Sequence, residues 1–136
     1  MLGVLKAIAL NSPADITVEI DGLTRELPRC NHLVLVKNPY IASGLRLDLP
    51  VANDDGRAFA LAVVGQGRLG LCRRLPGFYT GKIVRRKDVV LEPFSRIRVH
   101  ATKPVEIEFD GDPRGFLPVE AELIPRCLNL IGAADA

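Results

Sequence analysis

The chain has 136 residues, of which 48% are hydrophobic, 25% charged and 5% aromatic. This composition is typical of one folded domain, or of part of a larger one, and it excludes a disordered chain. The net charge of +2 is too small to indicate nucleic acid as the main partner. The three cysteines lie far apart without a Cys-x-x-Cys pair, which argues against a zinc site and predicts reduced thiols in a cytoplasmic protein.

The first ten residues, MLGVLKAIAL, form an apolar segment. The segment is too short to span a bilayer, which takes about 20 apolar residues. It also lacks the basic start and the cleavage site of a signal peptide. We therefore expect a short helix that packs on the core.

Strand periodicity follows. Apolar and polar residues alternate from Ile16 to Ile20, and Asp21-Gly22 is a favoured hairpin turn, so we expect a return strand from Leu23 to Leu27. The continuous apolar run from Leu33 to Val36 predicts a separate, central strand that is covered on both faces.

The middle of the chain combines loops, one strand and one helix. We expect an irregular stretch and then a short strand over residues 41–48, and a loop over residues 50–56. Phe59 to Val64 is an apolar strand. Apolar side chains at helical spacing predict a helix from Leu69 to Tyr79, which Pro76 would kink or divide.

After Gly81 the alternation of apolar and polar residues that is typical of strands returns. The apolar positions that define these strands are Val89 and Leu91; Ile97 and Val99; Val105, Ile107 and Phe109; Ala121 and Leu123; and finally Leu128, Leu130 and Ile131. Eight or so short strands predict a single, mostly β domain over residues 1–136. Its architecture would be an antiparallel β-sandwich or open barrel with one or two short helices.

A cluster of basic residues covers the predicted helix and the segment after it. The cluster consists of Arg73, Arg74, Lys82, Arg85, Arg86 and Lys87. Such a cluster could face anionic lipid headgroups. The plainer interpretation is a basic face in contact with solvent, which charge runs form more often.

Two acidic turns are candidates for chemistry: Asn53 to Gly56, and Asp110-Gly111-Asp112. Asp-Gly pairs are common simply because they fit tight turns. In the second case, however, strand alternation would place Glu106, Glu108 and Asp110 on one side. Crowded carboxylates raise one another's pKa, so that one could act as a base, and they could also bind a divalent cation.

Other catalytic signatures are missing. The sequence contains no GxSxG elbow, no Walker A loop and no GxGxxG loop. His32 and His100 are isolated residues on predicted strands, where a structural or surface role is more common than catalysis. The sequence has no evident nucleotide-binding element of its own.

The order of the motifs resembles the diacylglycerol/sphingosine lipid kinase family. The segment VLVKNPYIASGLRLDLPVANDDGRAFALAVV shares with it Asn38, Gly44, Pro50, Asp55-Gly56 and the strand from Ala58 to Val64. The segment VEIEFDGDPRGFLPVEAELIPRCLNLI resembles the end of the family's C-terminal domain through Asp110-Gly111-Asp112, Pro118, Pro125 and Leu128 to Ile131. Together the motifs cover the chain from about Ile16 to Ile131.

The resemblance implies the C-terminal, lipid-side half of an ATP-dependent kinase. Asp110 matches the residue that takes the proton from the lipid hydroxyl as it attacks the γ-phosphate. Asp112 matches an acidic residue that supports the magnesium and phosphate region, where the family usually has Glu. Asp55, with the main-chain carbonyls of Ala52 and Arg57, matches a structural Mg²⁺ site.

The nucleotide-binding features of the family are absent from these 136 residues, which contain neither a GGDGT-like loop nor the GTGNDFA-like segment. ATP would therefore bind only with an N-terminal domain, and we expect the chain to be inactive without one. The expected partner is a lipid with a free hydroxyl, with peripheral contact to an anionic inner membrane surface.

Two other interpretations stay open. The chain could be a non-catalytic β-sandwich module that binds a membrane or a protein through the Arg73 to Lys87 region. It could also self-associate as a homodimer through an exposed sheet edge, since an open edge invites pairing.

Overall fold

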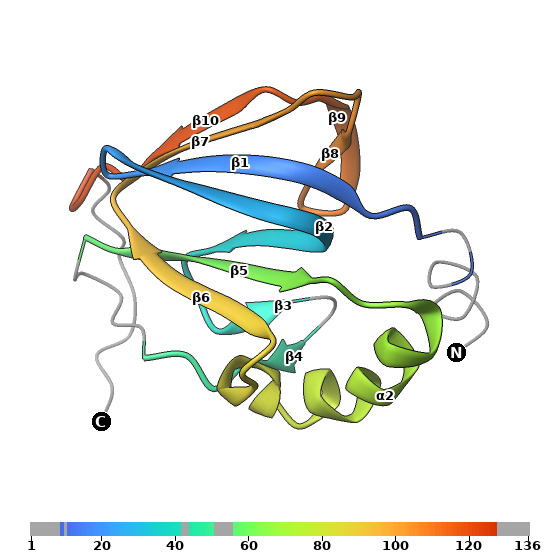
Figure 1. Ribbon diagram of the computed structural model, residues 1–136. Helices are drawn as coiled ribbons and strands as arrows, with labels where there is room; N and C mark the ends of the chain where they lie inside the picture. Colours follow the sequence, from blue (N-terminus) through green and yellow to red (C-terminus); the bar gives the residue numbers. More distant parts are fainter. Residues whose placement is uncertain (1–8, 10, 42–43, 51–55, 128–136) are drawn as a thin grey trace, which may run out of the picture.

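A curved antiparallel sheet forms the body of the domain in a computed structural model, which describes residues 9, 11–41, 44–50 and 56–127 (Figure 1). The strands are β1 (Ala14–Ile20), β2 (Leu23–Val36), β3 (Tyr40–Ile41), β4 (Leu45–Arg46), β5 (Ala58–Val64), β6 (Val89–Phe94), β7 (Arg96–Ala101), β8 (Glu106–Phe109), β9 (Asp112–Phe116) and β10 (Val119–Glu122). The helical elements are α2 (Arg68–Tyr79) and the 3₁₀-helix η1 (Lys82–Arg85).

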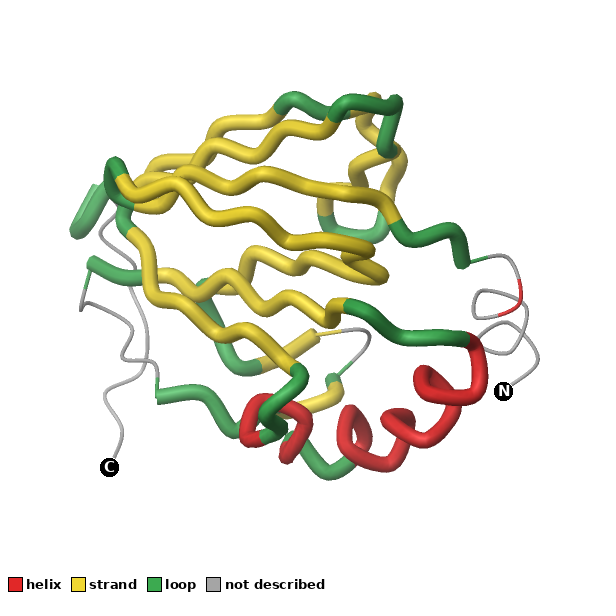
Figure 2. Tube along the Cα trace, viewed as in Figure 1, coloured by secondary structure: helices red, strands yellow, loops and turns green. Residues whose placement is uncertain are grey.

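The main sheet has six strands in the order β10-β7-β1-β2-β5-β6, and every neighbouring pair is antiparallel. Two small hairpins, β3–β4 and β8–β9, stand apart from it. Figure 2 shows the helices gathered at one end of the molecule, beside β3 and β4. The prediction of a mostly β, antiparallel and open fold with one or two short helices is confirmed.

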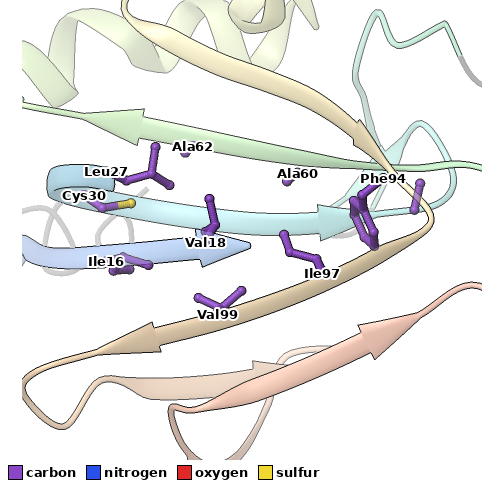
Figure 3. Close-up of a cluster of buried hydrophobic side chains, with 10 residues drawn as sticks. Ile16, Val18, Leu27, Cys30, Ala60, Ala62, Phe94, Ile97 and Val99 are labelled. Atoms are coloured by element: carbon purple, nitrogen blue, oxygen red, sulfur yellow. The ribbon is translucent and has the colours of Figure 1, made fainter. Parts of the chain in front are cut away.

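Apolar side chains pack on both faces of the sheet. Strand β5 is almost wholly buried because its alanines, such as Ala60, point into one cluster, while Leu61 and Val63 point into the other. The first cluster lines one face of the sheet and includes Ile16, Val18, Leu27, Cys30, Ala62, Phe94, Ile97 and Val99 (Figure 3). The second joins Leu61 and Val63 to Leu47, Ile83 and Val89, with Leu71 and Phe78 of α2 packed against it.

Strand β2 differs from the prediction, because the two expected strands are one strand of 14 residues. The pairing with β1 shifts register near Arg29, which has a positive φ of 49°. The Asp15 carboxylate accepts a hydrogen bond from the Arg29 amide at 2.8 Å, so a side chain replaces the missing ladder bond. The strand therefore passes through the bulge and pairs with β5 on the far side.

Helix α2 confirms the prediction to within one residue. It starts at Arg68 and continues through Pro76 without division. Pro76 lies in the last turn, where its missing amide removes a single hydrogen bond. The Thr80 amide still donates to the Pro76 carbonyl at 3.0 Å.

Strands β6 and β10 are the edges of the main sheet. β6 contains Pro93, which has no amide proton to offer a neighbour. β10 is only 4 residues long and carries two carboxylates, Glu120 and Glu122. Both features oppose edge pairing, and the homodimer stays a prediction.

Some expectations concern residues outside the described ranges. These are the helix over residues 1–10, apart from residue 9, most of the loop over residues 50–56, and the last strand at Leu128 to Ile131. No helix in the described ranges is long and apolar enough to cross a bilayer.

Candidate functional site

Asp110 lies at the tip of the β8–β9 hairpin. Asp110 and Gly111 form a two-residue turn between the paired residues Phe109 and Asp112. Their φ values of 51° and 87° fit the type I′ turn that Asp-Gly favours. All four of these residues are exposed, so the hairpin presents the Asp110 carboxylate at the surface.

Asp21 provides a comparison within the same chain. Asp21 and Gly22 join β1 to β2 in a turn of the same kind, with φ values of 47° and 87°. The Asp21 carboxylate accepts hydrogen bonds from the backbone amides of Ser95, at 3.2 Å, and Arg96, at 2.8 Å. It therefore connects the turn to β7.

The Asp110 carboxylate makes no hydrogen bond or ion pair with any part of the chain that the structure describes. The backbone preference of Asp-Gly is enough to form the turn, without a bond from the Asp110 carboxylate to another strand. The two turns have the same sequence and similar backbone φ values, yet within the described ranges only the side chain of Asp21 bonds to another part of the fold. As far as the described residues show, the Asp110 carboxylate is available to contact another molecule.

The expected row of three carboxylates does not form. Glu106 and Glu108 are exposed residues of β8, but the strand ends at Phe109. Asp110 has left-handed backbone geometry, so the period-two alternation does not extend to it. The described residues also contain no group of three or more His, Cys, Asp or Glu that could hold a metal ion, so they give no support to a cation site on this row.

Asp112 begins β9 on the other side of the turn and is exposed. Its carboxylate lies 3.6 Å from the guanidinium of Arg114. Both side chains are largely in water, where such a pair contributes little to stability. Asp112 therefore has a cationic neighbour, whereas Asp110 has none among the described residues.

His32 is an exposed residue of β2, where the sequence favoured a structural or surface role. Local desolvation lowers the pKa of this exposed side chain, and the charge of Glu108 in β8 opposes the shift. Because the charge of Glu108 acts on His32, β8 lies within electrostatic range of this part of β2. Nothing in the sequence signals this electrostatic interaction, because the charge belongs to a distant segment.

A hollow of about 260 Å³ lies between β7 and β10. It is lined by Arg98, Val99, His100, Pro118, Val119 and Glu120. The hydrogen bonds from Arg96 and Arg98 lower the pKa of Glu120, so this carboxylate is held ionised. The hollow is smaller than the roughly 300–1,000 Å³ of typical ligand pockets, so it does not by itself make a lipid cleft.

The predicted magnesium site falls mostly outside the described residues, since Ala52 and Asp55 are not among them. The third predicted ligand, the carbonyl oxygen of Arg57, accepts a hydrogen bond from the Lys37 ammonium at 2.8 Å. A fixed positive charge at this distance opposes a second cation on the same oxygen. The one described ligand thus gives no support to a metal, and the site stays a prediction.

Comparison with known proteins places this fold. The family model described as the YegS C-terminal NAD kinase beta sandwich-like domain matches residues 1–132. A search of curated proteins finds no match. Among solved structures, a "putative diacylglycerol kinase" from Bacillus anthracis str. Sterne has a TM-score of 0.71 at 17% identity, covering 91% of this chain and 42% of that one.

Two further structures from the same organism are similar. One, described as a diacylglycerol kinase, has a TM-score of 0.71 at 14% identity and the same coverage. The other, also named "putative", has a TM-score of 0.63 at 17% identity, with 89% of this chain and 41% of that one covered. At these identities the likeness shows the fold, and the chain spans less than half the length of each protein. Because the family model covers nearly the whole sequence, the chain belongs to the family of YegS C-terminal NAD kinase beta sandwich-like domains, as the resemblance to lipid kinases predicted.

Proposed function

We propose that this domain is the lipid-side half of an ATP-dependent lipid kinase of the diacylglycerol kinase type. In this proposal Asp110 is the general base, and a nucleotide-binding half supplies ATP. Family membership and the likeness to diacylglycerol kinases support the reaction class. One observation supports Asp110 as the base: its carboxylate is exposed at a hairpin tip and makes no hydrogen bond or ion pair with the described part of its own domain.

The chemistry is phosphoryl transfer to an alcohol. Asp110 accepts the proton of the lipid hydroxyl as that oxygen attacks the γ-phosphorus of ATP. A bond forms between the lipid oxygen and phosphorus, the bond from phosphorus to the β–γ bridging oxygen breaks, and ADP leaves. The proton then resides on the Asp110 carboxyl group.

The rigid geometry of the turn suits this role. A base must lie within hydrogen-bonding reach of the hydroxyl that it serves. The two-residue turn fixes the backbone of Asp110, while the absence of partners in its described surroundings leaves the carboxylate oxygens available. Asp112, which pairs with Phe109 next to the turn, would face the same phosphate and magnesium region, with Arg114 as its cationic neighbour.

The experiment joins the chain to a nucleotide-binding segment. The coding sequence immediately upstream is read for a GGDGT-type loop, and the encoded segment is produced together with this chain. Transfer of the γ-phosphate of ATP to diacylglycerol and to a sphingoid base is then measured. We expect the chain alone to be inactive, the combination to be active, and Asp110→Asn to lose roughly 10²–10⁴-fold in rate, as expected for a general base.

Glu122→Gln is the matched control, because it neutralises another exposed carboxylate on β10, away from the hairpin. It should keep the activity of the combination. Equal rates for Asp110→Asn and the unmodified chain would remove the proposed role of Asp110. If no upstream loop exists and no lipid is phosphorylated, the non-catalytic binding module becomes the better interpretation.

A further inference from the structure

Helix α2 has an exposed face that the proposed function does not use. Leu69, Arg73, Pro76 and Thr80 follow one another at spacings of four, three and four, so they form one stripe along the helix, flanked by Arg68 and Tyr79. All six residues are exposed, and Leu69 and Tyr79 keep 66% and 59% of their surface in water. We call these six residues the α2 face.

The opposite side of the helix fixes its orientation. Leu71 and Phe78 pack against the cluster that contains Leu61 and Ile83. Arg74 is buried and bound to Asp88, so it cannot belong to a surface patch. The α2 face therefore points away from the sheet, at the end of the molecule where the helices lie (Figure 2).

The charges around this face are of one sign. Neither α2 nor η1, which follows it, contains an acidic residue. Arg85 is paired with Asp48, and Arg86 with Asp88. Four other cations are exposed and make no ion pair within the described ranges: Arg68, Arg73, Lys82 and Lys87.

We propose that the α2 face docks on an anionic lipid bilayer. Leu69 and Tyr79 would lie at the boundary between headgroups and acyl chains, while Arg68 and Arg73 contact lipid phosphates from the same helix. Lys82 and Lys87 would extend the basic surface beyond the helix. This arrangement combines exposed apolar side chains with cations that make no ion pair within the described ranges, on one exposed side of the helix, as interfacial helices do.

A lipid surface fits these charges better than a protein partner does. Protein surfaces commonly carry positive and negative charges interspersed. To bind such a surface, this face would need some carboxylates of its own to pair with the partner's positive charges. The surface of a bilayer rich in phosphatidylglycerol is negatively charged throughout, so it attracts only positively charged side chains. The proposal does not rest on kinase activity, because docking requires neither ATP nor a second domain.

Vesicle sedimentation tests the charges. The full chain is mixed with vesicles of phosphatidylcholine alone or with an equal part of phosphatidylglycerol, at low and high salt. We expect binding only to the anionic vesicles, and its loss at about 1 M salt, where screening acts within about 3 Å. R68Q/R73Q should weaken the partition coefficient by roughly 30-fold, because each cation near the surface contributes substantially.

K103Q/R126Q is the matched control, since Lys103 and Arg126 are also exposed, make no ion pair within the described ranges, and lie in loops outside α2 and η1. It removes the same charge and should bind nearly as well as the unmodified chain. Circular dichroism checks that all variants are folded. Equal losses for both pairs would mean that only net charge matters and would overturn a specific face.

A second pair of variants tests the apolar contact. Leu69→Ser should weaken binding to the anionic vesicles several-fold. Leu23→Ser, at a leucine that is 77% exposed on β2, should leave it unchanged. Absence of binding to anionic vesicles at low salt, or no effect of Leu69→Ser, would overturn the proposal and favour a protein partner for this face.

Discussion

Arg74 and Asp88 tie helix α2 to the start of strand β6. The Nε of Arg74 donates a hydrogen bond of 2.5 Å to the Asp88 carboxylate, and its Nη1 donates to the Gly70 carbonyl at 2.6 Å. The Arg74 side chain is 10% exposed and that of Asp88 is 28% exposed. The pair therefore lies at the edge of the core, where loss of one partner leaves the other charge poorly solvated.

Replacement of Arg74 by Met should destabilise the fold. Met keeps most of the apolar volume but leaves Asp88 without its main partner. We expect a loss of about 2 kcal/mol in the free energy of unfolding, below the ~3–5 kcal/mol of a fully buried pair because Asp88 keeps some contact with water. Urea denaturation measures this loss. Arg73→Met, on the exposed face of the same helix, should change stability by less than about 0.5 kcal/mol, and equal losses for both variants would contradict the role of the pair.

The same pair predicts a dependence of stability on pH. Desolvation raises the pKa of Asp88, but hydrogen bonds from Arg74 and Arg86 outweigh it, so the pKa is lowered overall. A carboxyl whose folded pKa is lower than its unfolded value of about 3.9 stabilises the protein above that pH. This contribution is lost as the pH falls through the folded pKa. The difference in unfolding free energy between the unmodified chain and Asp88→Asn should therefore be constant above about pH 5 and shrink below about pH 4; a constant difference down to pH 2 would contradict it.

Local sequence patterns predicted the parts of the fold that depend on neighbouring residues. The alternation from Ile16 to Ile20 and the Asp21-Gly22 turn became β1 and its hairpin to β2. The helix was also predictable, since its spacing is a local property. The continuity of β2 was not, because it depends on a carboxylate of β1, Asp15, that satisfies the amide in the bulge.

The candidate site also has features that the sequence predicts and features that it does not. The Asp110-Gly111 turn was evident because Asp-Gly is a strong turn signal. The strand alternation ends at Phe109, one residue before the predicted Asp110, because Asp110 has a positive φ that a pattern of residue types does not show. The charge of Glu108 acts on His32 from a segment that is far away in sequence, so only the folded chain reveals this interaction.

Among the glycines that the structure describes, Gly81 has the tightest surroundings. A Cβ at this position would lie 2.3 Å from the carbonyl oxygen of Arg46, and its φ is 73°. Gly81→Ala should therefore destabilise by about 3 kcal/mol or more, because a backbone clash adds to the strain of positive φ. Gly65→Ala is the control, with φ of 68° and no atom within 4 Å. It should cost only about 1 kcal/mol, and similar losses for the two variants in urea denaturation would refute the clash.

Cys30 and Cys127 should differ in reactivity towards thiol reagents. Cys30 is buried in the sheet core, and desolvation raises the pKa of its thiol to about 11, so it stays protonated at neutral pH. Cys127 is exposed. Since the thiolate is the reactive form, a thiol reagent at pH 8 should modify Cys127 rapidly and Cys30 only after unfolding. Peptide mass mapping after a short reaction distinguishes the sites, and early modification of Cys30 would contradict its burial.

Asp21 and Asp110 allow the structural and functional uses of an Asp-Gly turn to be separated. Replacement of either residue by Ala removes the same turn preference at nearly the same φ. Asp21→Ala also removes the acceptor for the amides of Ser95 and Arg96, so it should cost about 1–3 kcal/mol more in unfolding free energy than Asp110→Ala. Urea denaturation of the two variants measures the difference. If Asp110→Ala were equally destabilising, the fold would need that carboxylate, and the argument that it is kept for a substrate would lose its basis. A small effect on stability would instead mean that the fold does not need the Asp110 carboxylate. That result would support a role for the carboxylate in contact with a molecule outside the domain.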